Sequence, residues 1–380
     1  MPDGLRIAHV VRRFDPLVGG TERYVGDLAR AQAKAGHDVT VITLDRDVLG
    51  VVEGRLPGRE LDRGVRIVRL PGFGSGRFAV TLRPDALLRI VRRSDVTHLH
   101  DVRFMLGTVG AWNRLGRRPT VLHTHGLIYG TRAWWRLKQL LSRIYYQPLI
   151  AATVTRVICS SKADEDRLRA FMPRLASKAV TVENGVDLGP FLSLERSPMA
   201  GRLAVVGRVT RLKGIDRFLR ALPAVSASWS LVIHGAAEGD EAQRLRAIAE
   251  GLGIADRVEF AGPYRTEEEP SLFKTPAAAI FPSTSEAMGM ALVDAMAAGV
   301  PVLASDIPAH RELLGESSPT ALIDFDRPDV VAEAIERILR TSEAETSRDA
   351  AVLRDAARHF DVGRLAHELD DLYRTLGVPG

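Results

Sequence analysis

Short apolar runs alternate with helix-like segments along almost the whole chain of 380 residues. Strand-like runs rich in β-branched residues occupy 5–11, 39–44 and 154–159, whereas 21–35 and 84–93 repeat their apolar positions every three or four residues. Because strands and helices take turns in this way, we predict parallel strands with helices covering the faces of the sheet.

The same alternation restarts after a Pro- and Ser-containing stretch at residues 186–200. We therefore predict an α/β protein with two doubly wound, Rossmann-like domains, at 1–185 and 201–358, joined by a linker over 186–200. The last segment, 359–380, carries leucines on one stripe of a helix and should dock on a core surface. Ligands of such sheets bind beyond the carboxyl ends of the strands, so the cleft between the two domains is the expected site.

Hydrophobic residues make up 46 % of the chain and charged residues 26 %, which fits a globular protein and disfavours a disordered or collagen-like one. The longest stretch without Asp, Glu, Lys or Arg, 221–237, is too short and too polar to span a bilayer. The N-terminus lacks the pattern of a secretory signal. The single cysteine, Cys159, excludes an internal disulfide and fits a reducing compartment, so we expect a cytoplasmic protein.

The net charge of +5 conceals two electrically opposite halves. Residues 1–185 hold 31 Lys and Arg against 17 Asp and Glu, and no acidic residue occurs between Asp101 and Asp164. A basic field of this kind attracts polyanions. No nucleic-acid-binding motif accompanies it, so nucleic acid is not an expected partner.

The segment 132–146 combines cations with aromatic and aliphatic residues at helical spacing. This composition is typical of a helix lying on an anionic membrane, and it predicts an acceptor or membrane surface formed by Trp134, Trp135, Arg136, Lys138 and Arg143. The alternative is a helix whose apolar stripe faces the core and whose basic side is solvated. The membrane interpretation implies a peripheral position on the cytoplasmic membrane face and a lipid-carried or phosphorylated substrate.

Two cations and two glycines follow a predicted strand at 203–207, just before a predicted helix. Arg208 can offer a planar fork to a diphosphate and Lys213 a compact positive charge, while Gly214 allows the backbone to approach the ligand. This combination indicates a phosphate site. The alternative is a solvated basic turn.

A second polar segment follows the predicted strand at 278–281. Glu286 lies where the chain leaves the sheet, and a carboxylate beside a helix N-terminus stays ionised and can accept hydrogen bonds from sugar hydroxyls. The free amides near Gly289 can face a phosphate or an oxyanion. Asp294 follows Glu286 by about two helical turns and can reach a second pair of hydroxyls on the same ligand. The alternative for both acids is a capping or exposed position.

Together these motifs resemble the retaining GT-B glycosyltransferases of family 4 (GT4). The resemblance rests on Arg208, Lys213 and the segment 285–302 (SEAMGMALVDAMAAGVPV), extends to Gly19 and Gly20, and covers nearly the whole chain. It implies a metal-independent, retaining hexosyltransferase with a C-terminal helix that crosses back to the N-terminal domain. It further implies a nucleotide-diphosphate sugar as the donor substrate, with no other cofactor.

The resemblance also implies a role for individual residues of this chain. Arg208 and Lys213 would hold the donor diphosphate, Glu286 would bind hydroxyls of the donor sugar, and His125 would lie near the reacting sugar. Further donor contacts are implied at Gly19, Gly20, Gly262, Gly289, Met290, Ala291 and Asp294. Members of the family usually have a glutamate where this chain has Asp294, and this departure weakens any inference about the donor.

Histidines end two predicted strands, at 98 and 100 and at 123 and 125. Alternate residues of a strand share one face, so these rings can approach one another, but no Cys or carboxylate cluster accompanies them. We therefore predict no metal site, and favour polar residues that line the cleft over buried, hydrogen-bonded histidines.

Three functions follow from the sequence. We predict the transfer of a hexose from a nucleotide-diphosphate sugar to the hydroxyl of a glycan acceptor, which would be lipid-linked or phosphorylated. A binding or regulatory protein with weak turnover stays open because of Asp294, and a sugar-phosphate epimerase is a more distant alternative.

Overall fold

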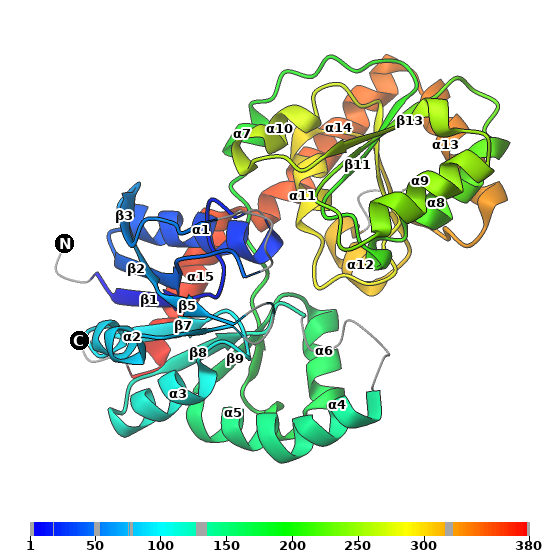
Figure 1. Cartoon of the computed structure of the whole chain (residues 1–380). Coiled ribbons are helices and arrows are strands. Elements are labelled where there is room, and N and C mark those ends of the chain that lie inside the picture. Colours follow the sequence, from blue (N-terminus) through cyan, green and yellow to red (C-terminus); the bar gives the residue numbers. More distant parts are fainter. Residues whose placement is uncertain are drawn as a thin grey trace. The chain divides into compact units, whose positions relative to one another are not determined.

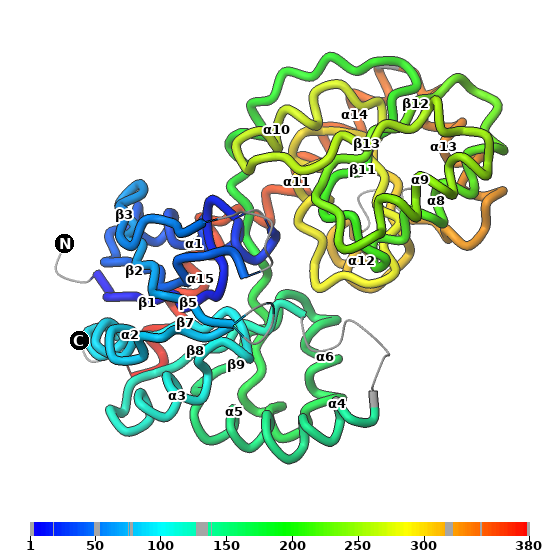
Figure 2. The backbone as a smooth tube through the Cα atoms, viewed as in Figure 1, coloured from blue at the N-terminus to red at the C-terminus, as the bar shows by residue number. Residues whose placement is uncertain are grey.

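The computed structural model describes residues 4–17, 19–48, 54–74, 76, 79–126, 135–315 and 322–377. The chain forms two compact units, one made of Met1–Gly185 with Val362–Gly380 and the other of Val186–Asp361. Each unit is an α/β structure built on a mainly parallel sheet (Figures 1 and 2). The predicted fold class, two doubly wound Rossmann-like domains, is therefore confirmed.

The first unit has an eight-stranded sheet in the order β10-β9-β8-β7-β1-β2-β4-β3. All neighbours pair in parallel except β3, which is antiparallel to β4. The strands are β1 (Arg6–Val10), β2 (Asp38–Leu44), β3 (Arg59–Asp62), β4 (Val65–Leu70), β7 (Val96–Leu99), β8 (Thr120–His123), β9 (Arg156–Cys159) and β10 (Ala179–Thr181), with a small separate pair of β5 (Gly72–Phe73) and β6 (Val80–Thr81). Strand order reverses between β1 and β7, and in doubly wound sheets this switch point is where ligands bind.

The helices of the first unit include the long final segment of the chain. They are α1 (Gly20–Lys34), α2 (Pro84–Val91), α3 (Leu106–Leu115), α4 (Trp135–Leu141), α5 (Gln147–Thr153), α6 (Lys162–Phe171) and α15 (Val362–Thr375). Figure 1 shows α15 beside α1, and its buried stripe includes Leu365, Leu369 and Tyr373. The predicted amphipathic helix thus docks on the N-terminal sheet layer.

The second unit has a six-stranded, fully parallel sheet in the order β13-β12-β11-β14-β15-β16. Its strands are β11 (Arg202–Val206), β12 (Ser230–His234), β13 (Val258–Gly262), β14 (Ala278–Phe281), β15 (Val302–Ser305) and β16 (Leu322–Ile323). Its helices are α7 (Gly189–Leu192), α8 (Ile215–Ala221), α9 (Glu241–Gly251), α10 (Glu269–Leu272), α11 (Met290–Ala298), α12 (Pro308–Leu314), α13 (Pro328–Arg340) and α14 (Glu343–Ala357).

Strand β11 shows why two apolar layers form around this sheet. Its side chains alternate in direction, so Ala204 and Val206 join one hydrophobic cluster while Leu203 and Val205 join the other. Both faces are covered by helices, which explains the uninterrupted apolar character of the strand. The switch point of this sheet lies between β11 and β14.

Residues 186–200 do not behave as the linker that their composition suggested. Val186, Leu188 and Phe191 are buried in the core of the second unit, and 189–192 form the short helix α7. The chain returns beside this point, since Val186 N–H donates to the carbonyl of Phe360 at 2.9 Å. Phe360 also belongs to this core, so the crossover to the first unit comes at Val362 rather than at 359.

None of the helices within the described ranges combines the length and the apolar character that a membrane span requires.

The burial of Phe191 yields a stability prediction. Its side chain is 2 % exposed, so Phe191→Ala should destabilise the protein by about 3–5 kcal/mol through lost transfer energy and the cavity left behind. Met199 of the same segment is 53 % exposed, so Met199→Ala should change the unfolding free energy by no more than about 0.5 kcal/mol. Urea denaturation of both variants measures the difference. Equal stability of the two variants would mean that the segment acts as a linker after all.

Candidate active site

Two residues that the sequence predicts to be catalytic are in direct contact in the second unit. Lys213 Nζ donates a hydrogen bond to Glu286 Oε1 at 2.7 Å, and the hydroxyl of Ser283 donates to the same oxygen at 2.7 Å. Both members of the ion pair keep part of their surface exposed, with 25 % and 16 % of the Lys213 and Glu286 side chains accessible. The lysine ammonium has three N–H donors, and the described residues engage one of them, which leaves two for a ligand.

The contact exists because two loops at the ends of neighbouring strands are tied together. Lys213 ends the 3-10 turn η4 (Arg211–Lys213), which follows β11, and Thr284 N–H from the loop after β14 donates to the carbonyl of Leu212 at 2.8 Å. Gly214 has φ +61°, and a Cβ there would lie 2.3 Å from the carbonyl oxygen of Pro282. A side chain at 214 would therefore push the two loops apart.

The electrostatic environment keeps Glu286 ionised. Burial alone would raise the pKa of its carboxyl group, but the positive charge of Lys213 and the hydrogen bonds from Lys213 and Ser283 outweigh burial and lower this pKa. An ionised Glu286 can only accept hydrogen bonds, which suits the recognition of hydroxyl groups.

Sequence reasoning missed His310 on α12, which interacts electrostatically with both Glu286 and Lys213. Burial lowers the pKa of His310, and its Nδ1–H donates to the carbonyl of Ser305 at 3.0 Å, which leaves Nε2 as an acceptor. His310 Nε2 lies 3.6 Å from where a Cβ would stand at Gly289. No local signal marked this histidine, because only the β15–α12 connection brings it here. Ser283, also missed, lies three residues before Glu286 and was within reach of the same motif.

The other predicted donor residues of this unit lie near the same edge of the sheet or on α11. Arg208 is exposed, and within the described ranges no hydrogen bond or ion pair holds its guanidinium. Gly289 has φ +111° and precedes the first turn of α11, which begins with Met290 and Ala291, both half-buried. Asp294 is fully buried inside the unit.

Gly262, the residue predicted near the nucleotide base, ends β13, and its carbonyl accepts a hydrogen bond from Gly235 N–H at 2.7 Å. It is therefore two strands away from β11 in the sheet.

In the first unit, Gly19 and Gly20 lie at the N-terminus of α1, directly after the loop that follows β1. Gly20 has open space where a Cβ would be, whereas a Cβ at Gly19 would lie 2.2 Å from the Glu22 carboxylate. Glu22 is paired with Arg13 at 2.9 Å. Arg12 was also missed: it pairs with Asp101 at 3.0 Å, and its buried Nε and Nη1 have no hydrogen-bond partner among the described residues.

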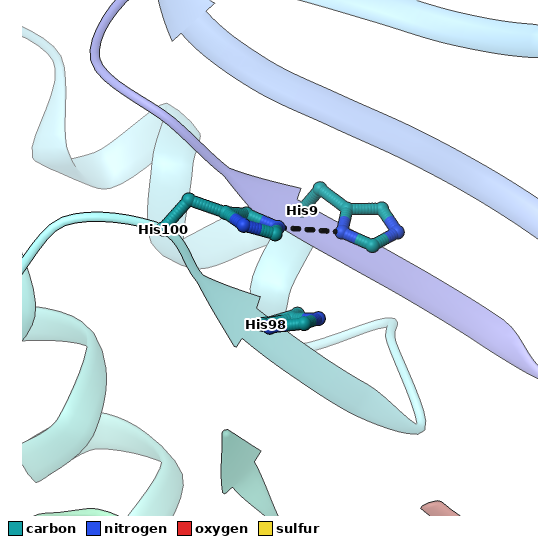
Figure 3. A group of neighbouring side chains, drawn as sticks. All are labelled: His9, His98 and His100. Carbon is teal, nitrogen blue, oxygen red and sulfur yellow. Dashed lines mark hydrogen bonds between the residues drawn. The ribbon is translucent and has the colours of Figure 1, made fainter. Parts of the chain in front are cut away.

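His125 stands at the end of a group of five histidines at the carboxyl ends of β1, β7 and β8. His9, His98, His100 and His123 are fully buried and His125 is 9 % exposed. The prediction that the histidines at 98, 100, 123 and 125 line the cleft is therefore wrong, and the alternative of buried, hydrogen-bonded histidines is confirmed. Figure 3 shows His9, His98 and His100 together, with His9 and His100 joined by a hydrogen bond. His125 has φ +48°, in the left-handed region, and its ring stacks on that of His123 with the centroids 4.0 Å apart. Burial lowers the pKa of His125 to about 3.

One ring nitrogen from each of His9, His98 and His100 lies within 4.8 Å of the other two, and the same holds for His100, His123 and His125. Neutral imidazoles at such separations have the donor chemistry of a transition-metal site. His9 was not among the predicted histidines, because it lies inside a strand with no neighbouring histidine in the chain.

From Trp135 onward the predicted membrane segment is helical, and a π-helical turn, η2 (Ser142–Tyr146), joins α4 to α5. Trp134 and the side chains of Trp135 and Lys138 lie outside what the structure describes, whereas Arg136 and Arg143 are exposed. The apolar residues of this stretch do not all face the core, because five of them are exposed, namely Leu137, Leu140, Leu141, Ile144 and Tyr145. The core-facing alternative is therefore wrong for these positions.

The chain is similar to known proteins over its full length. The model of the glycosyl transferases group 1 matches residues 195–358, and that of Glycosyltransferase Family 4 matches residues 18–189. The chain is 30 % identical to the GDP-mannose:cellobiosyl-diphosphopolyprenol alpha-mannosyltransferase of Xanthomonas campestris, over 99 % of this chain and 98 % of that protein. A protein of the same name from Komagataeibacter xylinus is also 30 % identical, over 97 % of this chain and 93 % of its own length.

Two solved structures show the same fold at lower identity. Anabaena HepE in complex with UDP-glucose has a TM-score of 0.76 at 18 % identity, covering 98 % of this chain and 100 % of that one. WaaG, a glycosyltransferase involved in lipopolysaccharide biosynthesis, has a TM-score of 0.67 at 18 % identity, covering 97 % and 99 %. The two α/β units, the Lys213–Glu286 pair and these similarities lead to one conclusion: the chain belongs to glycosyltransferase family 4 and is a hexosyltransferase with the GT-B fold.

Proposed function

We propose that this protein transfers a hexose from a nucleotide-diphosphate sugar to a polyprenyl-diphosphate-linked glycan on the cytoplasmic face of a membrane, with retention at the anomeric carbon. The single observation that carries the proposal is the Lys213–Glu286 ion pair at the ends of β11 and β14, with the exposed cation of Arg208 in the loop after β11. The Xanthomonas and Komagataeibacter relatives, whose names specify GDP-mannose and a diphosphopolyprenol acceptor, support GDP-mannose as the first donor to test.

Charge explains how these residues would act. Breaking the bond between sugar and diphosphate leaves an oxocarbenium-like sugar and a more negative leaving group, and cations beside that group bind it better in the transition state than in the ground state. Arg208 and the two unused donors of Lys213 would bind the diphosphate oxygens. In this mechanism the two side chains supply the charge neutralisation that a divalent metal gives in other transferases, so no metal is needed.

Glu286 would orient the donor sugar, while Lys213 would bind both the diphosphate and the Glu286 carboxylate. The ammonium at 2.7 Å keeps the carboxylate ionised, so Glu286 accepts bonds from sugar hydroxyls and also fixes the direction of the Lys213 amine. The amides at Gly289, Met290 and Ala291, at the start of α11, would contact sugar or phosphate. Asp294 is buried, so a contact with the ribose would require a water or a local movement.

In the first unit, the amides of Gly19 and Gly20 at the start of α1 would approach the diphosphate, and His125 would face the reacting sugar. Gly262 would lie near the nucleotide base.

The alternative of a binding protein with weak turnover retains the donor contacts and differs only in transfer. Incubation with GDP-mannose, UDP-glucose and ADP-glucose separates the two, because only the enzyme passes labelled sugar to a polyprenyl-diphosphate glycan.

The exposed apolar face of 137–145 supports a membrane-docking role. Three of the exposed apolar residues lie between two exposed cations, Arg136 and Arg143, and the other two follow directly, as in helices that lie in the interface of anionic bilayers. Each cation near such a surface contributes about 1 kcal/mol of attraction, which salt weakens. A polyprenyl-linked acceptor is itself held in the membrane, so this face would bring the enzyme to its substrate.

Loss of Arg208 should lower transfer selectively. Arg208→Ala should lower kcat/KM by an amount that corresponds to a loss of about 3 kcal/mol of transition-state stabilisation, which is typical of one preorganised donor. The matched control is Arg211→Ala, three residues away and paired with Glu241 on the surface at 3.7 Å, which should keep near-normal turnover. Steady-state kinetics with the best donor gives both values. A folded Arg208→Ala enzyme with unchanged kcat/KM would refute the assignment.

Membrane docking is tested by co-sedimentation with vesicles containing anionic lipid. The wild-type protein should bind these vesicles, bind neutral vesicles less, and dissociate as salt is raised. In the wild-type protein the exposed Leu140 and Ile144 would enter the apolar layer of the membrane. The double variant Leu140→Asp, Ile144→Asp should therefore lose binding. Leu115→Asp, at the end of α3, changes another exposed leucine of the same unit and should bind normally. Equal binding by both variants would exclude this face as the docking surface.

A further inference from the structure

A chain of buried hydrogen bonds runs from the C-terminal helix to His125. Gln32 Nε2 donates to Asp370 Oδ1 at 3.1 Å, and Gln32 Oε1 lies 2.8 Å from His9 Nε2. His9 Nδ1 lies 2.9 Å from His100 Nε2, and His100 Nδ1 lies 3.1 Å from His125 Nε2. All five side chains are buried, and each of them comes from a different strand, helix or loop of the first unit.

The donor and the acceptor of every bond in this hydrogen-bond chain follow from the carboxylate of Asp370 at one end. A carboxylate only accepts, so the NH2 group of Gln32 must face Asp370 and its oxygen must face His9. His9 then carries its proton on Nε2 and accepts on Nδ1, which requires a proton on Nε2 of His100. The same reasoning passes to the next ring, since His100 accepts on Nδ1 and His125 must donate from Nε2.

His37 fixes the acidic end from the other side. The backbone N–H of Leu5 donates to His37 Nδ1 at 3.0 Å, so the proton of His37 is on Nε2, which donates to Asp370 Oδ2 at 2.8 Å. Asp370 therefore receives a donor on each oxygen. The hydroxyl of Tyr373 also interacts with Gln32 and lies 2.6 Å from His98 Nδ1, but a rotating hydroxyl can donate or accept and imposes no direction.

The surroundings keep each ring neutral, as this single-proton pattern requires. Burial lowers the pKa of His9 to about 4 and of His125 to about 3, and it lowers the pKa of His100 well below its ordinary value. His98 and His123 stack on neighbouring rings, and Tyr24 lies edge-on to His100, His123 and His125, so the group is enclosed by aromatic surfaces.

We propose that Asp370 is a positioning residue which, through Gln32, His9 and His100, holds His125 in the tautomer with its proton on Nε2 and its lone pair on Nδ1. Within the described residues Nδ1 of His125 has no hydrogen-bond partner. That atom is therefore an acceptor for a hydroxyl of the bound sugar, which deepens the proposed function and rests on it. A reversed chain would present an N–H there instead, so the sugar hydroxyl could no longer donate to His125 and could only accept from it.

The first test is the tautomer itself in the ligand-free protein. Two-bond 15N–1H correlations of histidine-labelled protein distinguish protonated from unprotonated ring nitrogens, and the signals are assigned with the His125→Gln variant. We expect His9, His100 and His125 all protonated on Nε2. A proton on Nδ1 of His125 overturns the proposal, and so does a stoichiometric metal ion retained by the natively purified protein, because a metal would occupy the lone pairs that the chain uses.

Asp370→Asn provides the second test, since it changes the end of the chain without changing its shape. His37 still needs an acceptor, so the Asn oxygen turns to His37 and its NH2 group turns to Gln32. Gln32 must then flip, and the protons of His9, His100 and His125 should all move to Nδ1. Asp371→Asn removes the same charge from the adjacent, exposed position and should leave the wild-type tautomers. Unchanged tautomers in a folded Asp370→Asn protein overturn the proposal.

Kinetics connects the tautomer to transfer. We expect Asp370→Asn to lower kcat by about ten-fold or more with little change in KM for the donor, as for the loss of a positioned acid–base group, whereas Asp371→Asn keeps kcat. Reversed tautomers with unchanged kcat would overturn the role of His125 as an acceptor. If the wild-type protein shows the expected tautomers but transfers no sugar, the proposed function fails while the tautomer assignment stands.

Discussion

The ion pair between Lys213 and Glu286 joins two loops that are 73 residues apart in sequence, and the candidate site of the second unit is built around it. A lysine alone at the end of β11 would be a mobile, solvated charge, and a buried glutamate alone would tend to take up a proton. Paired at 2.7 Å, each stabilises the charged form of the other, so the site has a fixed positive group and a fixed acceptor side by side. The short 3-10 turn and Gly214 serve to bring the two together.

The first unit has neutral groups, rather than an ion pair, at its switch point. Its switch point between β1 and β7 is filled by stacked imidazole rings rather than by charges, because burial removes the positive form of each histidine. Uncharged rings can still fix the donor-to-acceptor direction of a hydrogen-bond chain, since each one donates at one nitrogen and accepts at the other. The carboxylate at the far end of this chain lies on α15, the last helix in the sequence, so folding of the first unit is complete only when that helix has returned to it.

Several parts of this architecture could be predicted from the sequence, because they depend on local pattern. The alternation of strands and helices, the break near residue 186 and the polar residues after β11 and β14 are all visible in short windows. The interpretation of 186–200 as a linker was wrong because Pro and Ser suggest a loop, whereas Val186, Leu188 and Phe191 are buried by a core that is assembled from distant segments. His310 was missed since its closeness to Glu286 arises only from the order of strands in the sheet, whereas Ser283 was overlooked within the same short segment as Glu286.

The sequence by itself determined the fold class, the family and the candidate residues Arg208, Lys213, Glu286 and His125, since each is marked by spacing within one strand-to-helix connection. Only the tertiary structure decided which of these residues meet, that the apolar face of 137–145 is exposed, and that Asp370 and Gln32 reach His125 through two other rings. The physical reason is that a hydrogen bond depends on separations of about 3 Å, and residues hundreds of positions apart come that close only when parallel strands bring their ends to one edge of a sheet.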